Sequence, residues 1–65
     1  MADQDDWAAM PIGEPARRAL RNAGLTSVDQ LGSVSADYLA GLHGMGPKAL
    51  AVLATAMRER GVEHS

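Results

Sequence analysis

The residues best suited to chemistry in this sequence lie in one short string, LHGMGPKAL, which runs from Leu42 to Leu50. Gly44 and Gly46 remove side chains from a tight turn, and Met45 between them is expected to plug the core. The backbone N–H groups that begin the next helix then face outward, and glycine offers no side chain to cap them. Such amides attract anions together with the helix dipole, and Lys48 adds a full positive charge nearby. The string therefore predicts a docking site for a phosphate oxygen.

A purely structural role is the competing interpretation of this string. Glycine-containing turns between helices are common, and water can satisfy exposed amides. The string is more selective than a bare Gly-x-Gly, however, because an apolar residue precedes the glycines and a Pro-Lys-Ala-Leu sequence follows them. We expect docking there to involve the nucleic-acid backbone and to be largely indifferent to base sequence. The residues predicted to contact DNA are Gly44, Met45, Gly46, Lys48, Ala49, Arg17, Arg18 and His43.

Two helices between Ser35 and Arg60 are predicted to position the string. Ser35 is a good N-cap, and Asp37 is favourably placed in the first turn of the helix that follows. The connection over residues 43–47 is too short for a crossover and is rich in residues that permit positive φ or begin a helix. The second helix is expected to begin at Pro47 and to end at Gly61. The apolar residues assigned to these helices are Tyr38, Leu39 and Leu42 in the first and Leu50, Leu53, Ala54 and Met57 in the second.

An earlier helix is predicted to begin at Pro15, which suits the first helical position, and to be capped by Gly24. Its opposite face carries cations that either meet phosphate or are simply solvated, and these two alternatives stay open. The cations are Arg17, Arg18 and Arg21. The stripe that faces the core is Ala16, Ala19, Leu20 and Ala23, at i, i+3, i+4 and i+7.

A short helix is predicted between these two regions of the chain. Thr26 and Asp29 lie three residues apart and match a capping box, and Val28 and Leu31 supply the buried side of the helix. The helix is expected to end within residues 32–34.

The predicted domain spans residues 14–62, with an acidic N-terminal arm over residues 1–13 and a C-terminal tail over residues 63–65. Pro11 and Gly13 break any long helix in the arm, so we expect one short turn there. Trp7 is expected to pin the arm by covering the core. We favour this role over base stacking, because the acidic neighbours of Trp7 repel phosphate.

The charges of the chain are unevenly distributed. The net charge is −2, but residues 1–14 carry four acids and no base, whereas residues 15–65 carry six bases and four acids. Residues 15–65 therefore have a mildly basic net charge of +2, and the N-terminal residues 1–14 have a net charge of −4. This is a weak electrostatic footprint for a DNA-binding protein and limits the affinity to be expected.

Length and composition argue against several classes of function. Sixty-five residues allow a single domain with a thin core, and the absence of cysteine favours a reducing, cytoplasmic setting. His43 and His64 are 21 positions apart with no carboxylate constellation around them, so we expect no metal site, no cofactor and no enzyme activity. No stretch is apolar for the length that a membrane span requires, and no small-molecule substrate is expected.

The string from Leu42 to Leu50 resembles the helix-hairpin-helix motif, in which a hydrophobic-Gly-hydrophobic-Gly sequence joins two short helices. The wider span from Pro15 to Val62 resembles the C-terminal domain of the bacterial RNA polymerase α subunit in the order and spacing of its elements. The resemblance implies an all-α fold of four to five helices, compact and sterile-alpha-motif-like (SAM-like). It also implies a surface for the DNA minor-groove backbone, formed by the first helix and the hairpin.

Gly46 and Lys48 fall on contact positions of that family. The family's principal DNA-binding arginine aligns near Pro15 and a contact asparagine near Arg18, so Arg17 or Arg18 is expected to substitute. The leading hypothesis is therefore a DNA-backbone binding module. The alternative is a protein-interaction or dimerisation domain of SAM-like shape, which the acidic arm favours.

Overall fold

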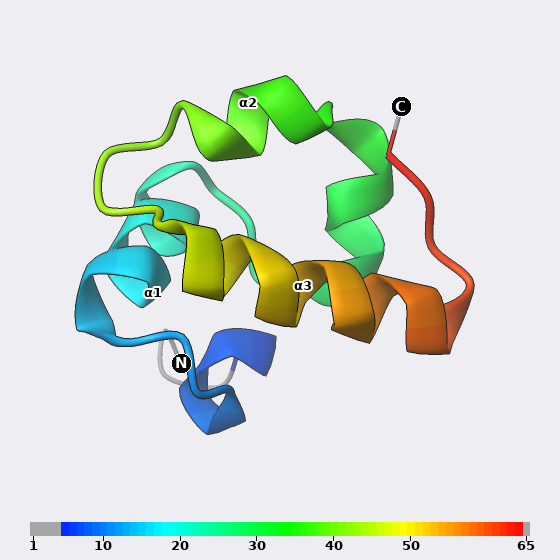
Figure 1. Cartoon of the computed structure of the whole chain (residues 1–65), viewed down its shortest axis with the longest axis horizontal. Coiled ribbons are helices and arrows are strands. Elements are labelled where there is room, and N and C mark those ends of the chain that lie inside the picture. Colours follow the sequence, from blue (N-terminus) through cyan, green and yellow to red (C-terminus); the bar gives the residue numbers. More distant parts are fainter. Residues whose placement is uncertain (1–4, 65) are drawn as a thin grey trace.

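The computed structural model describes residues 5–64 of the chain. Across this range the chain is all-helical and contains no strand. It forms two short 3₁₀ helices, η1 (Asp6–Ala9) and η2 (Val28–Ser33), and three α-helices, α1 (Glu14–Asn22), α2 (Ala36–Ala40) and α3 (Pro47–Arg60). The longest helix, α3, crosses the whole molecule, with α1 beside its start and α2 above it (Figure 1). The predicted all-α class is confirmed.

One hydrophobic core joins these helices. The largest fully buried side chains come from every part of the described chain and are Trp7, Leu20, Val28, Leu31, Leu39 and Leu53. Leu53 and Met57 of α3 belong to this core as predicted, and Leu50 packs against it while half-buried. The prediction for Ala54 is wrong, because Ala54 is exposed and Ala49 is buried in its place. Ala49, Leu53 and Met57 follow one another at intervals of four residues, so they share one face of the helix.

The segment before α1 is part of the same core. Trp7 is fully buried, and its indole Nε1 donates a hydrogen bond of 2.8 Å to the Leu25 carbonyl. Ile12 is buried in the same cluster. Trp7 therefore covers the core as expected, and its ring offers no free face for a base. The first four residues of the predicted arm lie outside the described residues.

Two predicted helix starts are displaced by one residue. α1 begins at Glu14, so Pro15 occupies its second position, and Gly24 follows the helix with a φ of 80°. The capping box of η2 is formed by Ser27 and Gln30, whereas Thr26 and Asp29 were predicted. The longer Gln30 side chain reaches back over the start of η2, and its Oε1 accepts a hydrogen bond of 3.1 Å from the Ser27 N–H.

α2 is shorter than the sequence pattern indicates. Ser35 caps it as predicted, because its hydroxyl accepts a hydrogen bond of 3.0 Å from the Tyr38 N–H. The helix ends at Ala40, which leaves Leu42 in the connection that follows. α2 has five residues, and the one that is buried is Leu39. Tyr38 was predicted to face the core but is 47% exposed, since adjacent residues lie about 100° apart around a helix.

The C-terminal end is held against η2. Gly61 ends α3 as predicted, and its φ of 70° is in the left-handed region. The chain then turns back, and Nδ1 of His64 lies 3.1 Å from the Val34 carbonyl oxygen at the end of η2. None of the helices in residues 5–64 combines the length and apolar character needed to cross a membrane.

Candidate nucleic-acid interface

The connection between α2 and α3, residues 41–46, is packed against the start of α1. Gly44 has a φ of 97°, a backbone conformation that side-chain-bearing residues rarely adopt. A Cβ atom on Gly44 would lie only 2.7 Å from the carbonyl oxygen of Pro15. Gly44 is therefore required by the packing of the connection on α1, which brings the start of α3 beside α1 (Figure 1).

Gly46, two residues later, has no such internal requirement. Its φ of −110° and ψ of 174° suit any residue, and a Cβ atom there would meet nothing within 4 Å. Gly46 is the N-cap of α3 and, having no side chain, provides no capping hydrogen bond. The space next to the first turn of α3 is thus open to a close external approach.

The first turn of α3 presents backbone amides without acceptors. Leu50 makes the first hydrogen bond of the helix, to the Gly46 carbonyl at 3.0 Å, and Pro47 has no N–H. Within residues 5–64 the N–H groups of Gly46, Lys48 and Ala49 have no acceptor. These amides lie at the positive end of the helix dipole and are suited to hold an anion.

Lys48 strengthens this preference for negative charge. Its side chain is exposed at the second position of α3, and the first turn contains no acid. A cation at a helix N-terminus is unfavourable for the helix itself, since it adds to the positive end of the dipole. An anion bound there would be stabilised by both charges.

Two other predicted contact residues pack their side chains into or against the core. The Ala49 side chain is buried, so only its amide can take part. Met45 is half-buried and packs against the core, as expected of the residue between the glycines, and its N–H donates to the Leu42 carbonyl at 3.1 Å.

Arg17 is used inside the protein. Its Nε donates to the Trp7 carbonyl at 2.9 Å, and its Nη2 donates to the Met10 carbonyl at 2.7 Å. A third group, Nη1, lies 3.1 Å from a carboxylate oxygen of Glu14. From the sequence, the Arg17 side chain was expected either to bind phosphate or to be solvated. In the structure it instead joins the N-terminal segment to α1 through hydrogen bonds. We therefore assign Arg17 a structural role in place of the predicted DNA contact.

The acids of the N-terminal segment are also paired with arginines. Asp5 lies 2.6 Å from Nε of Arg21, and this hydrogen bond holds the pKa of Asp5 below its ordinary value of 3.8. Asp6 lies 3.4 Å from Arg60 and also accepts a hydrogen bond of 2.8 Å from the Val28 N–H. The negative charge of this segment is thus partly neutralised by basic side chains of the domain.

Arg18 and His43 meet in a hollow beside the hairpin. Both side chains are exposed, and neither forms a hydrogen bond or ion pair with another residue in the 5–64 range. The hollow has a volume of about 300 Å³ and reaches Gly44, so it unites three of the predicted site residues. Glu14 is the acid at its edge, and the carboxylate of Glu14 is engaged by Arg17. The full lining is Glu14, Pro15, Arg18, Ala19, Asn22, His43 and Gly44.

A second hollow of about 260 Å³ adjoins the first and includes two residues that sequence reasoning did not place in the site. They are Asn22, at the end of α1, and Tyr38, which the apolar pattern assigned to the core. Asn22 was detectable in principle, because asparagine is a poor helix former and is found more often at caps and turns. The lining is Ala19, Asn22, Ala23, Tyr38, Leu42 and His43.

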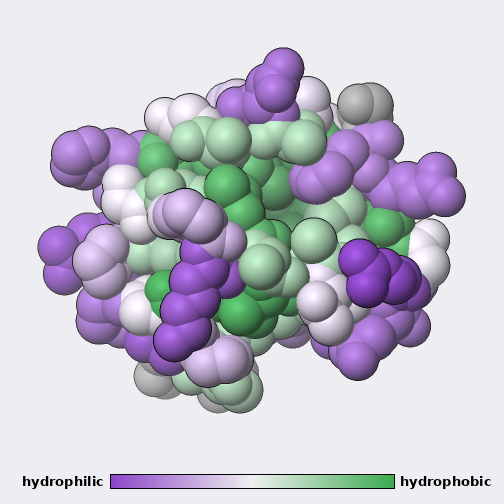
Figure 2. Space-filling model, in the orientation of Figure 1, coloured by the Kyte–Doolittle hydropathy of each residue, from purple (hydrophilic) through white to green (hydrophobic). Residues whose placement is uncertain are grey.

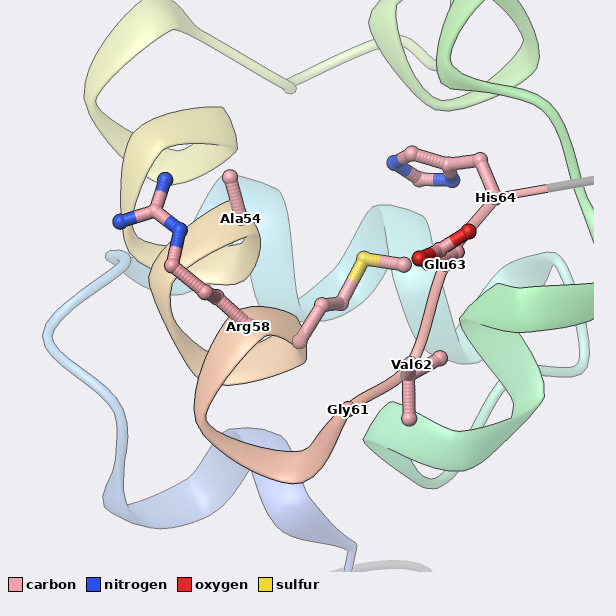
Figure 3. Close-up of a pocket in the computed structure, with 7 residues that line it drawn as sticks. Ala54, Arg58, Gly61, Val62, Glu63 and His64 are labelled. Carbon is pink, nitrogen blue, oxygen red and sulfur yellow. The ribbon is translucent and has the colours of Figure 1, made fainter.

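A further hollow, with a volume of about 400 Å³, lies elsewhere, at the C-terminal end of α3. Figure 3 shows Arg58 and His64 on opposite sides of it, with Val62 and Gly61 at the turn out of the helix. A mainly apolar hollow of about 390 Å³ separates α2 from α3. In the view of Figure 2, many apolar side chains gather near the centre of the face and most hydrophilic ones lie toward its rim. No group of three or more metal-ligating side chains occurs in the part of the chain described.

Comparisons of the chain with protein-family models, with curated proteins and with solved structures find no significant match. A function for this protein is therefore argued from the chemical groups present at the hairpin. These groups are open amides, the ammonium group of Lys48 and, in a neighbouring hollow, the guanidinium group of Arg18.

Proposed function

We propose that α2, the connection over residues 41–46 and α3 form a helix-hairpin-helix, and that this domain binds the phosphate backbone of DNA. The observation that carries the proposal is the contrast between its two glycines. Packing inside the protein requires Gly44, whereas it leaves Gly46 open and the amides behind it without acceptors. A phosphate oxygen is an acceptor of the right charge and size for those amides.

The first helix supplies the second contact in this proposal. Arg18 is exposed beside Gly44 and His43, on the part of α1 that the hairpin approaches. A first helix and a hairpin that together contact backbone are what the resemblance to the RNA polymerase α C-terminal domain implies. With Arg17 engaged by carbonyl groups, Arg18 takes the place of the family's arginine.

The charges of this surface set the expected strength of binding. Lys48 and Arg18 are the permanent cations of the proposed interface, so about two phosphates are neutralised. The logarithm of the binding constant should then fall against the logarithm of salt concentration with a slope of about −2. Binding to unrelated duplex sequences should be similar, because phosphate contacts carry no base information.

The test is a salt titration of DNA binding with two charge-reversal variants. Lys48→Glu should weaken binding to unrelated duplexes alike and reduce the salt slope by about one counterion. Glutamate is favoured in the first turn of a helix, so the fold should be kept. Arg58→Glu is the matched control, since it makes the same charge change on an exposed residue at the other end of α3. Equal losses in both variants, or no salt-sensitive binding by the parent, would contradict the proposal.

A protein-interaction or dimerisation domain is the second candidate, and the apolar hollow between α2 and α3 favours it. Its walls include Ala36, Ala40, Leu50 and Ala54. Sedimentation at increasing protein concentration would detect self-association. Self-association that Ala54→Glu abolishes, together with an absence of DNA binding, would favour this second function.

A further inference from the structure

Tyr38 is an exposed aromatic side chain that the core does not use. Tyr38 is a large side chain that is 47% exposed, whereas its neighbour Leu39 is buried. The Tyr38 side chain forms no hydrogen bond within the described range of the chain. Neither packing nor hydrogen bonding therefore explains an aromatic ring at this position.

The hollow that Tyr38 lines has the features of a site for a flat, polar group. Its other planar side chains are His43 and Asn22, and neither forms a side-chain hydrogen bond to another residue in the 5–64 range. Ala19 and Ala23 contribute small side chains to the lining, which leaves space between the larger ones. Asn22 offers both a hydrogen-bond donor and an acceptor through its amide.

This hollow adjoins the one beside the hairpin. The two share Ala19, Asn22 and His43, and the second extends to Arg18 and Gly44. We call the combined surface the α1–hairpin trough. If the hairpin binds one phosphate of a nucleic-acid strand, the neighbouring nucleotide of that strand can therefore reach the trough.

We infer that the α1–hairpin trough receives an unpaired base of single-stranded DNA, with its face on Tyr38 and its edge at Asn22. The inference rests on the proposed function, since the hairpin supplies the phosphate contact. Stacking on an aromatic side chain is open to every base, because every base has a π-face. A base within a duplex is already stacked and paired, so it cannot enter. The domain therefore prefers single-stranded DNA to duplex DNA.

The test compares a single-stranded oligonucleotide of mixed sequence with its duplex, at one salt concentration, by fluorescence anisotropy. Tyr38→Ala should lower the affinity for the single strand about tenfold, which is the order of one lost base–aromatic stack, and should leave duplex affinity unchanged. Tyr38→Phe should behave as the parent, because stacking does not need the hydroxyl. Circular dichroism checks that each variant is folded.

Two further readouts separate the inference from the proposed function. The chain contains one tyrosine, so upfield ring-proton shifts of Tyr38 on adding the single strand would report stacking without ambiguity. Lys48→Glu should weaken binding of both DNA forms. If Lys48→Glu weakens both while Tyr38→Ala changes neither, the proposed function stands and the base site is refuted. If the parent binds neither DNA form, both are refuted.

Discussion

Gly44 packs so closely against Pro15 that a Cβ atom on Gly44 would lie only 2.7 Å from the Pro15 carbonyl oxygen. This close approach fixes the hairpin on α1, and it separates two glycines that look alike in the sequence. Gly44 is required by the fold, whereas Gly46 has open space where a Cβ atom would lie and a backbone conformation that any residue can adopt.

The two glycines should therefore respond differently to alanine. Gly44→Ala should destabilise the domain by about 1–3 kcal/mol, because a side chain is strained at positive φ and collides with α1. Gly46→Ala should cost less than about 1 kcal/mol, since alanine is only a poorer N-cap. Urea denaturation of both variants measures the difference. Equal losses of stability would show that the contact between Gly44 and Pro15 is not the constraint described.

DNA binding should show the opposite order among folded variants. The methyl group of Gly46→Ala would stand in the open space next to the free amides and hold a phosphate oxygen away from them. Affinity should fall about tenfold, the equivalent of one charge-assisted hydrogen bond. Unchanged affinity of this variant would place the phosphate elsewhere.

Arg17 and Arg18 form a second matched pair, on one helix and adjacent in sequence. Arg17→Ala should lower the stability by about 1–3 kcal/mol, because the Trp7 and Met10 carbonyls lose their charged donor. Arg18→Ala should leave the thermal midpoint nearly unchanged and reduce the salt slope of DNA binding by about one. Melting curves and salt titrations of both variants test whether Arg17 serves stability and Arg18 serves DNA binding. A stable Arg17→Ala variant with lost DNA binding would reverse these assignments.

The ion pair between Asp5 and Arg21 should make the stability of the fold depend on pH in the acidic range. Arg21 holds the pKa of Asp5 below 3.8, so the charged carboxylate favours the folded state. This contribution is complete above the ordinary pKa and is lost as the pH falls through the lowered value. Asp5→Asn should therefore melt earlier than the parent at about pH 6, and the difference should shrink as the pH falls below 3.8. A difference that grows toward acid pH would contradict the pairing.

The sequence predicted the order of the helices and most of the caps because those signals are local. Ser35, Gly24 and Gly61 act within one turn of their own helix, and all three behave as predicted. The role of Arg17 could not be predicted in this way. Its partners are backbone carbonyls in η1 and just after it, which folding brings to α1.

The errors at Tyr38 and Ala54 have a related cause. Each is one residue away from the true core position, and an apolar pattern in a short or alanine-rich helix fits two neighbouring faces almost equally well. Packing against the rest of the molecule decides between these faces: it buries Leu39 but not Tyr38 in α2, and Ala49 but not Ala54 in α3. The apolar pattern therefore could not predict that Tyr38 is exposed and lines the trough beside the hairpin.

The central claim, that the first turn of α3 holds a phosphate, is tested most directly at the amides themselves. A titration of isotope-labelled protein with a short DNA duplex, followed by amide chemical shifts, reports each N–H group separately. The account predicts the largest changes at Gly46, Lys48 and Ala49, with smaller ones near Arg18 and little change at Gly61. Changes centred on the hollow between α2 and α3, with the Gly46 and Lys48 amides unmoved, would contradict it.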